Sequence, residues 1–257
     1  MAFLFYVSRV LEFIGGVTLL AWRVLKMIVR GRLDANLTIH QMVMLGVNSI
    51  PITMLVLGFG GAVFSYVMAD EMYQRGAGSL IGGMLLLMLL REIIPLFGGT
   101  VLAGKIGATI TSEIGTMKIS EQIDALKALS TDPDWYLTAP RVLACVLMTP
   151  VVNVFAGYAG WYCGYYVAHQ TTGMGYTSFT ASVQMLVDWG DVVQCLIKSI
   201  VFGTAIVLTA CYYGFRAQGG AAGVGRAVTS SVVINILLLY VLDLLLTITL
   251  RGIKIHI

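Results

Sequence analysis

The stretch ANLTIHQMVMLGVNSIPITMLVLGFGGAVFSYVMA, residues 35–69, contains no Asp, Glu, Lys or Arg. An α-helix needs roughly 20 apolar residues to cross a bilayer, so this stretch comfortably contains a first membrane span at residues 43–69. Residues 142–187 form another stretch that lacks the same four residue types. Helices that lie in lipid therefore decide the fold.

The composition of the whole chain agrees with this reading. Of its 257 residues, 58% are hydrophobic and only 11% are charged, whereas soluble globular domains carry about 25% charged residues. Too few charges are present to cover a soluble surface of this size. The sequence excludes an ordinary soluble enzyme and predicts an all-α integral membrane protein with one domain over residues 1–257.

Five spans follow from the positions of the apolar runs. Spans one and two occupy residues 43–104, as 43–69 and 76–104; spans three to five occupy residues 142–250, as 142–168, 192–215 and 227–250. A loop rich in Gly and Thr at residues 169–178, followed by a partly inserted helix, is predicted between spans three and four. Two spacings, Gly78/Gly82 and Gly160/Gly164, favour close helix packing.

Residues 1–32 are predicted to form an amphipathic helix that lies along the membrane interface. Their charged members fall on one helical face, and the remaining surface is apolar; the charged residues are Arg9, Glu12, Arg23, Lys26 and Arg30. A first span from Leu11 to Trp22 is the alternative, but it is short for a crossing. No basic residue precedes the apolar stretch and no small-residue cleavage pattern follows, so we do not expect a cleaved signal peptide.

The distribution of basic residues predicts the orientation. Most Lys and Arg residues outside the spans lie in residues 1–32, in the segment 105–141 and in the loop 214–226. The positive-inside rule places these regions and the N-terminus in the cytoplasm. With five crossings, the C-terminus lies outside.

Charged residues inside the spans mark a candidate site. Arg91 and Glu92 lie within span two, where each charge costs a few kcal/mol unless it is paired or hydrated. Pro95 removes the amide that would bond to the carbonyl of Arg91, which predicts a kink or a water-lined opening. The functional interpretation is a headgroup or gating site at which Arg91 attracts an anion; the alternative is an interhelical ion pair that fixes packing. Asp243 raises the same question, whereas snorkelling is the favoured interpretation of Lys198.

The segment 105–141 is the main polar part of the chain. Ile119, Ile123, Leu126 and Leu129 recur at helical spacing, which predicts a short amphipathic helix that Ser120 caps. Pro133 disfavours helix at Asp132 and is expected to end it. We expect this helix to dock a cytoplasmic partner.

Apparent nucleotide and metal motifs fail on their context. The string GTVLAGKI at 99–106 has Ile106 where a phosphate-binding loop needs Ser or Thr, and it ends an apolar span. The run GVGRAV at 223–228 lacks a third glycine and a preceding strand. The cysteines and histidines show no metal-ligand spacing, so we expect no metal site. Any ATP and Mg²⁺ would bind to another chain, and no nucleic-acid partner is expected.

Several longer motifs resemble the MlaE/YrbE-type permease subunits of bacterial ABC transporters associated with MCE proteins. The resemblance rests on LLREIIP at 89–95, AGKIGATITSEIGTMKISEQIDALKALSTDP at 103–133, the PR pair at 140–141, LIKSIVFG at 196–203 and GGAAGVGRAV at 219–228. Residues 1–88 agree mainly in layout. Two departures are Lys105, where the family usually has Arg, and Ile93-Ile94, which replaces a more usual Leu-Gly.

This resemblance implies a homodimeric permease in the bacterial inner membrane that moves phospholipids or related lipids. It implies two cytoplasmic ABC ATPase subunits and an MCE-domain protein on the outer side as partners. The Arg91-Glu92 pair would lie near a lipid cavity at the dimer centre. The residues implied to couple to the ATPase are Glu113, Gly115, Thr116, Met117, Glu121, Gln122 and Asp124.

Other classes of function remain open on the sequence. An ion- or proton-coupled carrier would use Arg91, Glu92, Lys198 and Asp243 as a relay. An intramembrane enzyme would pair Asp243 with Glu92 or Asp188 for acid–base chemistry, although no Ser or His is paired to them by sequence. A structural membrane scaffold would tolerate charge reversal at Glu92.

Overall fold

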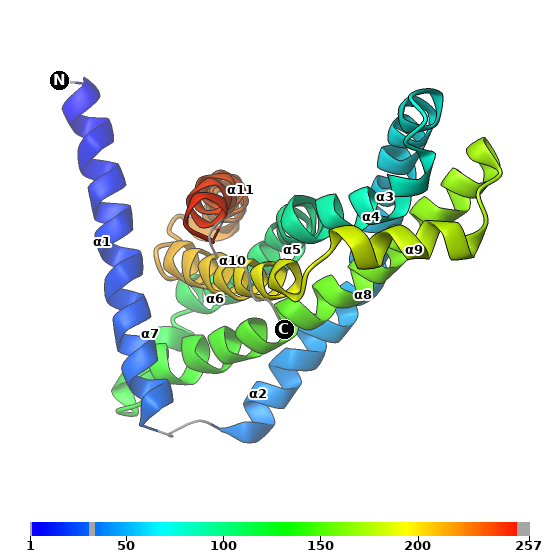
Figure 1. Cartoon of the computed structure of the whole chain (residues 1–257). Helices are drawn as coiled ribbons and strands as arrows, with labels where there is room; N and C mark the ends of the chain where they lie inside the picture. Colours follow the sequence, from blue (N-terminus) through cyan, green and yellow to red (C-terminus); the bar gives the residue numbers. More distant parts are fainter. Residues whose placement is uncertain (1, 31–33, 251–257) are drawn as a thin grey trace. The chain divides into compact units, whose positions relative to one another are not determined.

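The computed structural model describes the backbone of residues 2–30 and 34–250. Side chains are described for residue 8 and from residue 11 onward within these ranges, so the prediction for Arg9 lies outside the described residues. Throughout this part of the chain the regular elements are helices (Figure 1). The all-α prediction is therefore confirmed.

The elements follow in chain order. The N-terminal half comprises α1 (Ala2–Val29), α2 (Ala35–Gln41), η1 (Met42–Gly46), η2 (Val47–Ser49), α3 (Ile50–Gln74), η3 (Gly78–Leu80), α4 (Ile81–Met88), η4 (Leu89–Phe97), α5 (Gly98–Leu102), η5 (Ala103–Gly107), α6 (Ala108–Ile119) and α7 (Gln122–Ala128). Then come η6 (Asp134–Thr138), α8 (Ala139–Thr172), α9 (Tyr176–Leu186), α10 (Trp189–Phe215) and α11 (Gly220–Leu250).

Among the described residues, five helical stretches are long and apolar enough to cross a membrane. They are Ala35–Gln74, Gly78–Ile119, Asp134–Thr172, Trp189–Phe215 and Gly220–Leu250. Each corresponds to one predicted span, and only the second begins later than predicted, at residue 78 instead of 76. The prediction of a loop at 169–178 is too long, because α8 continues to Thr172 and α9 begins at Tyr176. The second stretch also extends well beyond residue 104, into the predicted polar segment.

Helix α1 is continuous from Ala2 to Val29 and is not one of the five stretches. Leu11, Leu19 and Trp22 are exposed, whereas Leu20 and Val24 are buried. The next helix begins at a well-formed N-cap, since Asp34 Oδ1 accepts a hydrogen bond from the Asn36 amide at 2.9 Å. The buried and exposed faces of α1 fit the predicted interfacial helix.

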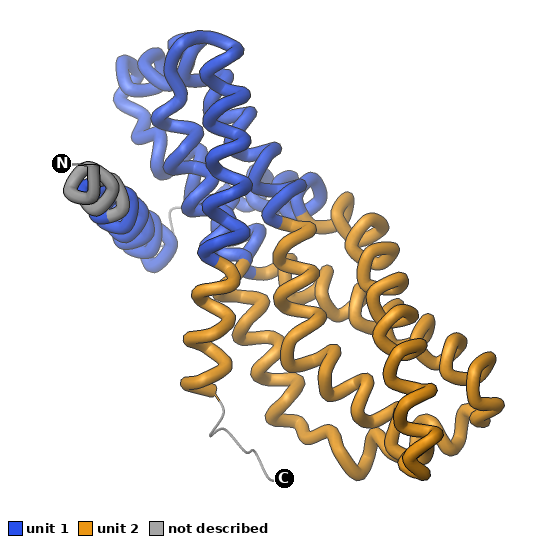
Figure 2. Tube along the Cα trace, turned by 90° about the horizontal axis from the view of Figure 1, so that it is seen from above, with its two compact units in different colours: residues 1–45, 103–146, 203–238 blue, residues 46–102, 147–202, 239–257 orange. Residues whose placement is uncertain are grey.

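The chain divides into two compact units (Figure 2). The first comprises residues 1–45, 103–146 and 203–238, and the second comprises residues 46–102, 147–202 and 239–257. Each unit therefore draws its helices from sequence-distant parts of the chain.

Close backbone contacts hold the second unit together. A Cβ atom on Gly61 would meet the carbonyl of Gly160, and one on Gly82 would meet the carbonyl of Phe179. Ser182 Oγ accepts a hydrogen bond from the Gly83 amide at 2.8 Å, which fastens α9 to α4. A Cβ atom on Gly160 would itself lie 2.9 Å from the carbonyl oxygen of Leu57. The predicted packing role is therefore confirmed for Gly82 and Gly160.

Buried hydrogen bonds between α6, α10 and α11 hold the first unit together. Thr111 Oγ1 donates to the carbonyl of Ala210 at 3.2 Å, and it lies 2.9 Å from Ser231 Oγ, with which it shares a second hydrogen bond. Asn235 Nδ2 donates to the carbonyl of Ile206 at 3.4 Å. Such interhelical bonds hold helices together where hydrophobic burial alone gives little preference between lipid and protein.

Candidate functional site

The π-helix η4 carries the first three predicted site residues. Pro95 lies inside this element and cannot donate to the carbonyl of Arg91, four residues earlier. The ammonium group of Lys198, on α10, donates to this carbonyl oxygen at an Nζ–O distance of 2.7 Å. The helix is irregular at the level that Pro95 predicts, and a side chain from another helix contacts the carbonyl there.

Lys198 is the centre of a buried polar cluster. Its side chain is only 2% exposed, and its Nζ lies 2.8 Å from Asp243 Oδ1 and 3.3 Å from Glu92 Oε2. It also donates to Thr247 Oγ1 at 2.7 Å, and Thr247 donates to Glu92 Oε1 at 3.2 Å. The expectation that Lys198 snorkels to an interface is wrong, because two carboxylates neutralise the ammonium group inside the protein.

Arg91 pairs with a residue that the sequence interpretation did not select. Its Nε donates to Asp191 Oδ1 at 2.7 Å, and the other oxygen of Asp191 accepts from the Asp188 amide at 3.0 Å. The Asp191 side chain is 3% exposed, whereas that of Arg91 is 49% exposed. A buried carboxylate therefore fixes one edge of the guanidinium group and leaves donors available for a ligand.

A cavity of about 280 Å³ adjoins this cluster and is lined by Arg91, Glu92, Gln194, Thr247 and Ile248. The Glu92 side chain is 44% exposed, so both charged groups from η4 reach the accessible side of the cluster. Their partners, Lys198 and Asp191, are buried behind them. The arrangement presents one cation and one anion at a cavity, supported by buried groups of opposite charge.

The structure brings Arg91, Glu92 and Asp243 to one site and adds Lys198, Asp191 and Thr247. Asp191 and Lys198 are seven residues apart on α10, which places them on one helical face. This spacing of seven residues is the sequence feature that could have identified Asp191 as a site residue. Thr247 is four residues after Asp243 on α11, but a lone Thr at helical spacing does not by itself distinguish a site residue.

The prediction of one capped helix within the segment 105–141 is wrong in its details. Helix α6 ends at Ile119 and α7 begins at Gln122, because Glu121 adopts a left-handed conformation with φ of 61°. Ser120 Oγ donates to the carbonyl of Thr116 at 2.8 Å, so it closes α6 and does not cap α7. Helix α7 ends at Ala128, before the predicted stop at Asp132.

The predicted coupling residues lie along this broken helix. Glu113 binds Arg141 through a 2.9 Å contact, and Gly115 is packed against Val224 and Ala217. Five of the seven are exposed: Glu113, Thr116, Glu121, Gln122 and Asp124; Met117 is partly buried. Of the four apolar positions, Ile123 is buried but Leu129 is 76% exposed.

The carboxylate of Asp124 lies 3.1 Å from Lys118 Nζ and 3.2 Å from Lys127 Nζ. Hydrogen bonds from Lys118 and then Lys127 hold the pKa of this carboxyl below its usual value. Asp124 thereby joins the end of α6 to α7 across the break at Glu121.

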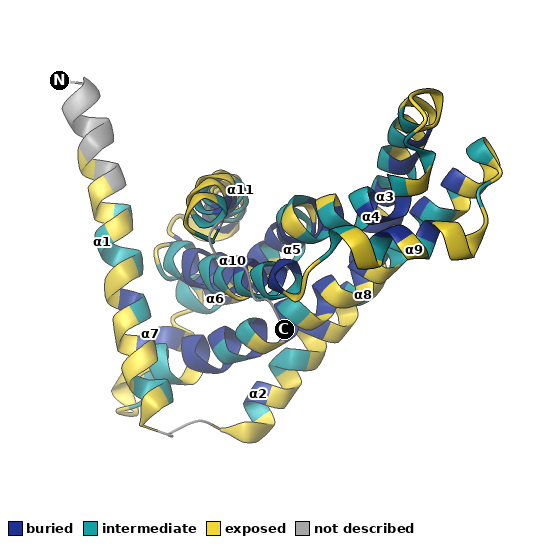
Figure 3. Cartoon of the chain, in the orientation of Figure 1, coloured by how far each residue is buried: buried dark blue, intermediate teal, exposed yellow. Residues whose placement is uncertain are grey.

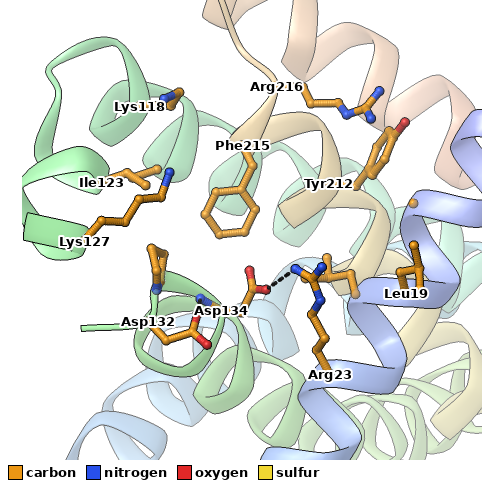
Figure 4. Close-up of a pocket in the computed structure, with 13 residues that line it drawn as sticks. Leu19, Arg23, Lys118, Ile123, Lys127, Asp132, Asp134, Tyr212, Phe215 and Arg216 are labelled. Atoms are coloured by element: carbon orange, nitrogen blue, oxygen red, sulfur yellow. Dashed lines mark hydrogen bonds and ion pairs between the residues drawn. The ribbon is translucent and has the colours of Figure 1, made fainter. Parts of the chain in front are cut away.

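A cavity of about 480 Å³ lies between α1 and this segment (Figure 4). Arg23 on α1 pairs with Asp134 at 3.3 Å on one side of the cavity, and Ile123 and Lys127 lie across from it in the figure. Glu12 pairs with Arg216 at 2.6 Å, and the Arg216 guanidinium lies 4.5 Å from the centre of the Tyr212 ring. Two ion pairs therefore connect α1 to Asp134, the first residue of η6, and to Arg216, the residue after α10.

The five apolar stretches, the ion-paired cluster between helices and the charged segment after the second stretch define a multi-pass helical membrane protein of the transporter type. The chain belongs to the MlaE permease family, because the family model described as Permease MlaE matches residues 38–249. This confirms the resemblance seen in the sequence motifs.

Related proteins agree with this assignment. The chain is 40% identical over 223 residues to a probable ABC transporter permease protein of Synechocystis, covering 86% of this chain and 84% of that protein. It is 35% identical over 234 residues to a probable ABC transporter permease protein of Rickettsia felis, with coverage of 91% and 90%. A probable ABC transporter permease protein of Porphyra purpurea is 35% identical over 202 residues, with coverage of 79% and 77%.

Proposed function

We propose that this chain is the membrane subunit of an ABC transporter that moves phospholipids or related lipids between the inner membrane and the outer envelope. The observation that carries the proposal is the half-exposed guanidinium of Arg91, held by buried Asp191 at a cavity within an apolar helical unit. A lipid needs both parts of this arrangement. Its phosphate suits the guanidinium, and its chains suit the apolar helices.

The ATP-hydrolysing step is assigned to partner proteins. The chain would bind two cytoplasmic ABC ATPase subunits through the segment 105–141, in which Thr116, Glu121 and Gln122 are exposed. This orientation follows the positive-inside rule, with the N-terminus in the cytoplasm and the C-terminus outside the inner membrane. The permease itself would hold neither ATP nor Mg²⁺ and would have no catalytic residues.

The proposed assembly is a homodimer with an MCE-domain protein on the outer side. Large apolar side chains on α3 and α11 are exposed in the single chain, which fits such partners (Figure 3); they include Leu55, Phe59, Val63, Leu244 and Ile248. ATP-driven closure would act on the 105–141 segment and shift the helices between two states with different affinity for lipid. Arg91 and Glu92 would bind the headgroup in one of these states.

The first experiment is purification of the tagged chain from its native host in mild detergent, followed by assays for associated proteins, ATP hydrolysis and bound lipid. Copurification of an ATPase and a phospholipid is expected. Arg91→Gln should retain the ATPase but lose most of the bound phospholipid, whereas Arg75→Gln should retain both. Arg75 is a matched control, because its only described ion pair is an exposed one with Glu71. A chain that carries no ATPase in several mild detergents would contradict the proposal.

An ion- or proton-coupled carrier is the second candidate. The observation that favours it is the local charge: among the described residues, the carboxylates of Glu92, Asp191 and Asp243 pair with two cations, Arg91 and Lys198. An additional proton or cation would balance this cluster. Transport that continues without ATP and stops when the proton gradient is collapsed would select this candidate over the ABC transporter.

A further inference from the structure

The second unit contains another cavity, of about 490 Å³, between α4, η4, α8, α9 and α10. We call it the lateral cavity; its walls include Leu86, Leu90, Ile94, Val154, Val183 and Leu196. These side chains are hydrocarbon, and no Asp, Glu, Lys or Arg among the described residues lines the space. The polar lining residues include Asn153, Thr180 and Gln184, but most of the exposed lining is apolar. The lateral cavity therefore favours an apolar occupant.

The lateral cavity and the cavity at Arg91 use different residues of the same two elements. On η4, Leu90 and Ile94 line the lateral cavity, whereas Arg91 and Glu92 line the polar one. On α10, Leu196 lines the lateral cavity and Gln194 lines the polar one. The two spaces are distinct sites, so an occupant of the lateral cavity would not be the headgroup ligand of Arg91.

Two lining residues show that the lateral cavity is open to the surroundings of the helices. Val154 is 58% exposed and Tyr158 is 66% exposed, and both lie on α8 within one of the membrane-crossing stretches. In a bilayer, the molecules that surround such a stretch are lipid chains.

The size of the space favours a flexible chain over a helix of a partner protein. A helix with its side chains is about 10 Å wide and rises about 5.4 Å per turn, so roughly one turn would fill the lateral cavity. A hydrocarbon chain can enter without a rigid diameter. Trp161 also lines the cavity.

We propose that the lateral cavity binds one acyl chain of a lipid from the surrounding bilayer. The chain would pack against Leu90 and Ile94 and support η4 from the side opposite to its charged residues. This binding needs neither ATPase partners nor transport, so it does not rest on the function proposed above.

Trp161 provides the test, because it lines the lateral cavity. A variant with Trp161 as its sole tryptophan, made by replacing Trp22, Trp135 and Trp189 with Phe, is reconstituted in phosphatidylcholine vesicles with and without bromine on the acyl chains. Bromine quenches tryptophan fluorescence at short range. Val183→Phe, which fills the cavity from α9, is compared with Ala181→Phe, an exposed position on the same helix. Leu196→Phe fills the cavity from α10 and serves if Val183→Phe does not fold.

Brominated chains are expected to quench Trp161 in the parent protein. Quenching should fall by about twofold or more in the filled variants, because an added ring excludes the chain from the space. It should be unchanged in Ala181→Phe. Equal quenching in the parent, filled and control proteins would overturn the proposal, as would the absence of quenching in the parent.

Discussion

The ammonium group of Lys198 donates a hydrogen bond to the backbone carbonyl of Arg91, at an Nζ–O distance of 2.7 Å. The carbonyl belongs to the residue whose usual helical donor is removed by Pro95. The same ammonium group pairs with Asp243 on α11 at 2.8 Å. One buried side chain on α10 thus connects η4, which carries Arg91, to the last helix.

Removal of this side chain is expected to be strongly destabilising. Lys198→Met should lower the free energy of unfolding by about 3–5 kcal/mol, because Glu92 and Asp243 lose the cation that offsets their charge in a low-dielectric environment. Lys127→Met, at an exposed ion pair, should change it by at most about 1 kcal/mol.

Denaturant unfolding of the purified chain measures both values. If the cause is the unpaired charge, adding Glu92→Gln and Asp243→Asn to Lys198→Met should restore most of the lost stability. A Lys198→Met protein as stable as the parent would show that the cluster contributes nothing to the fold.

The contact between Gly61 and Gly160 gives a second prediction. Gly61→Ala should cost several kcal/mol, because its Cβ would meet the carbonyl of Gly160 and force α3 and α8 apart. The neighbouring Gly60 has nothing within 4 Å of an added Cβ. Gly60→Ala should therefore be neutral or stabilise the helix by up to about 1 kcal/mol. Thermal unfolding of the two variants side by side checks this, and equal effects would contradict the packing role of Gly61.

Substitutions near the break between α6 and α7 can distinguish an effect on protein stability from an effect on coupling to the ATPase. Glu121 and Ser130 both have positive φ, of 61° and 57°, which strains any residue with a side chain. Gly at either position should stabilise the protein by about 0.5–1 kcal/mol. Only Glu121→Gly removes a predicted coupling residue, so only this variant should lower the ATPase activity of the purified complex. Equal activity in the two variants would remove Glu121 from the coupling surface.

Low pH is expected to weaken the ion pairs of Asp124 with Lys118 and Lys127, which join α6 to α7. The pKa of Asp124 is lowered from the usual value of 3.8, by hydrogen bonds from Lys118 first and Lys127 second. Since the lower pKa belongs to the folded state, the two ion pairs stabilise the connection above pH 3.8 and are lost as the pH falls through the lowered pKa. Backbone hydrogen exchange across residues 118–128, corrected for intrinsic rates, should rise in that range. Asp124→Asn should abolish the dependence; a wild-type pH profile in this variant would assign it to another group.

The periodicity and the charge-free runs were sufficient to predict the five spans, the N-terminal helix and a helix between the third and fourth spans. Each of these is set by local hydrophobicity over 20 or so residues. The break in the 105–141 segment was not predictable in the same way. Glu121 is left-handed although nothing in its residue type favours that conformation, so the continuous helix inferred from Ile119 and Ile123 was wrong.

The sequence by itself determined that this chain lies in a membrane, that charges at Arg91, Glu92 and Asp243 are exceptional there, and that its motifs are those of the MlaE permeases. Tertiary structure alone decided the pairing: Arg91 with Asp191, and Lys198 with both Glu92 and Asp243. Hydrophobicity is a property of each local run and can be read along the chain. The stabilisation of a buried charge depends on which group lies within about 4 Å of it, and that distance exists only after helices distant in sequence have packed.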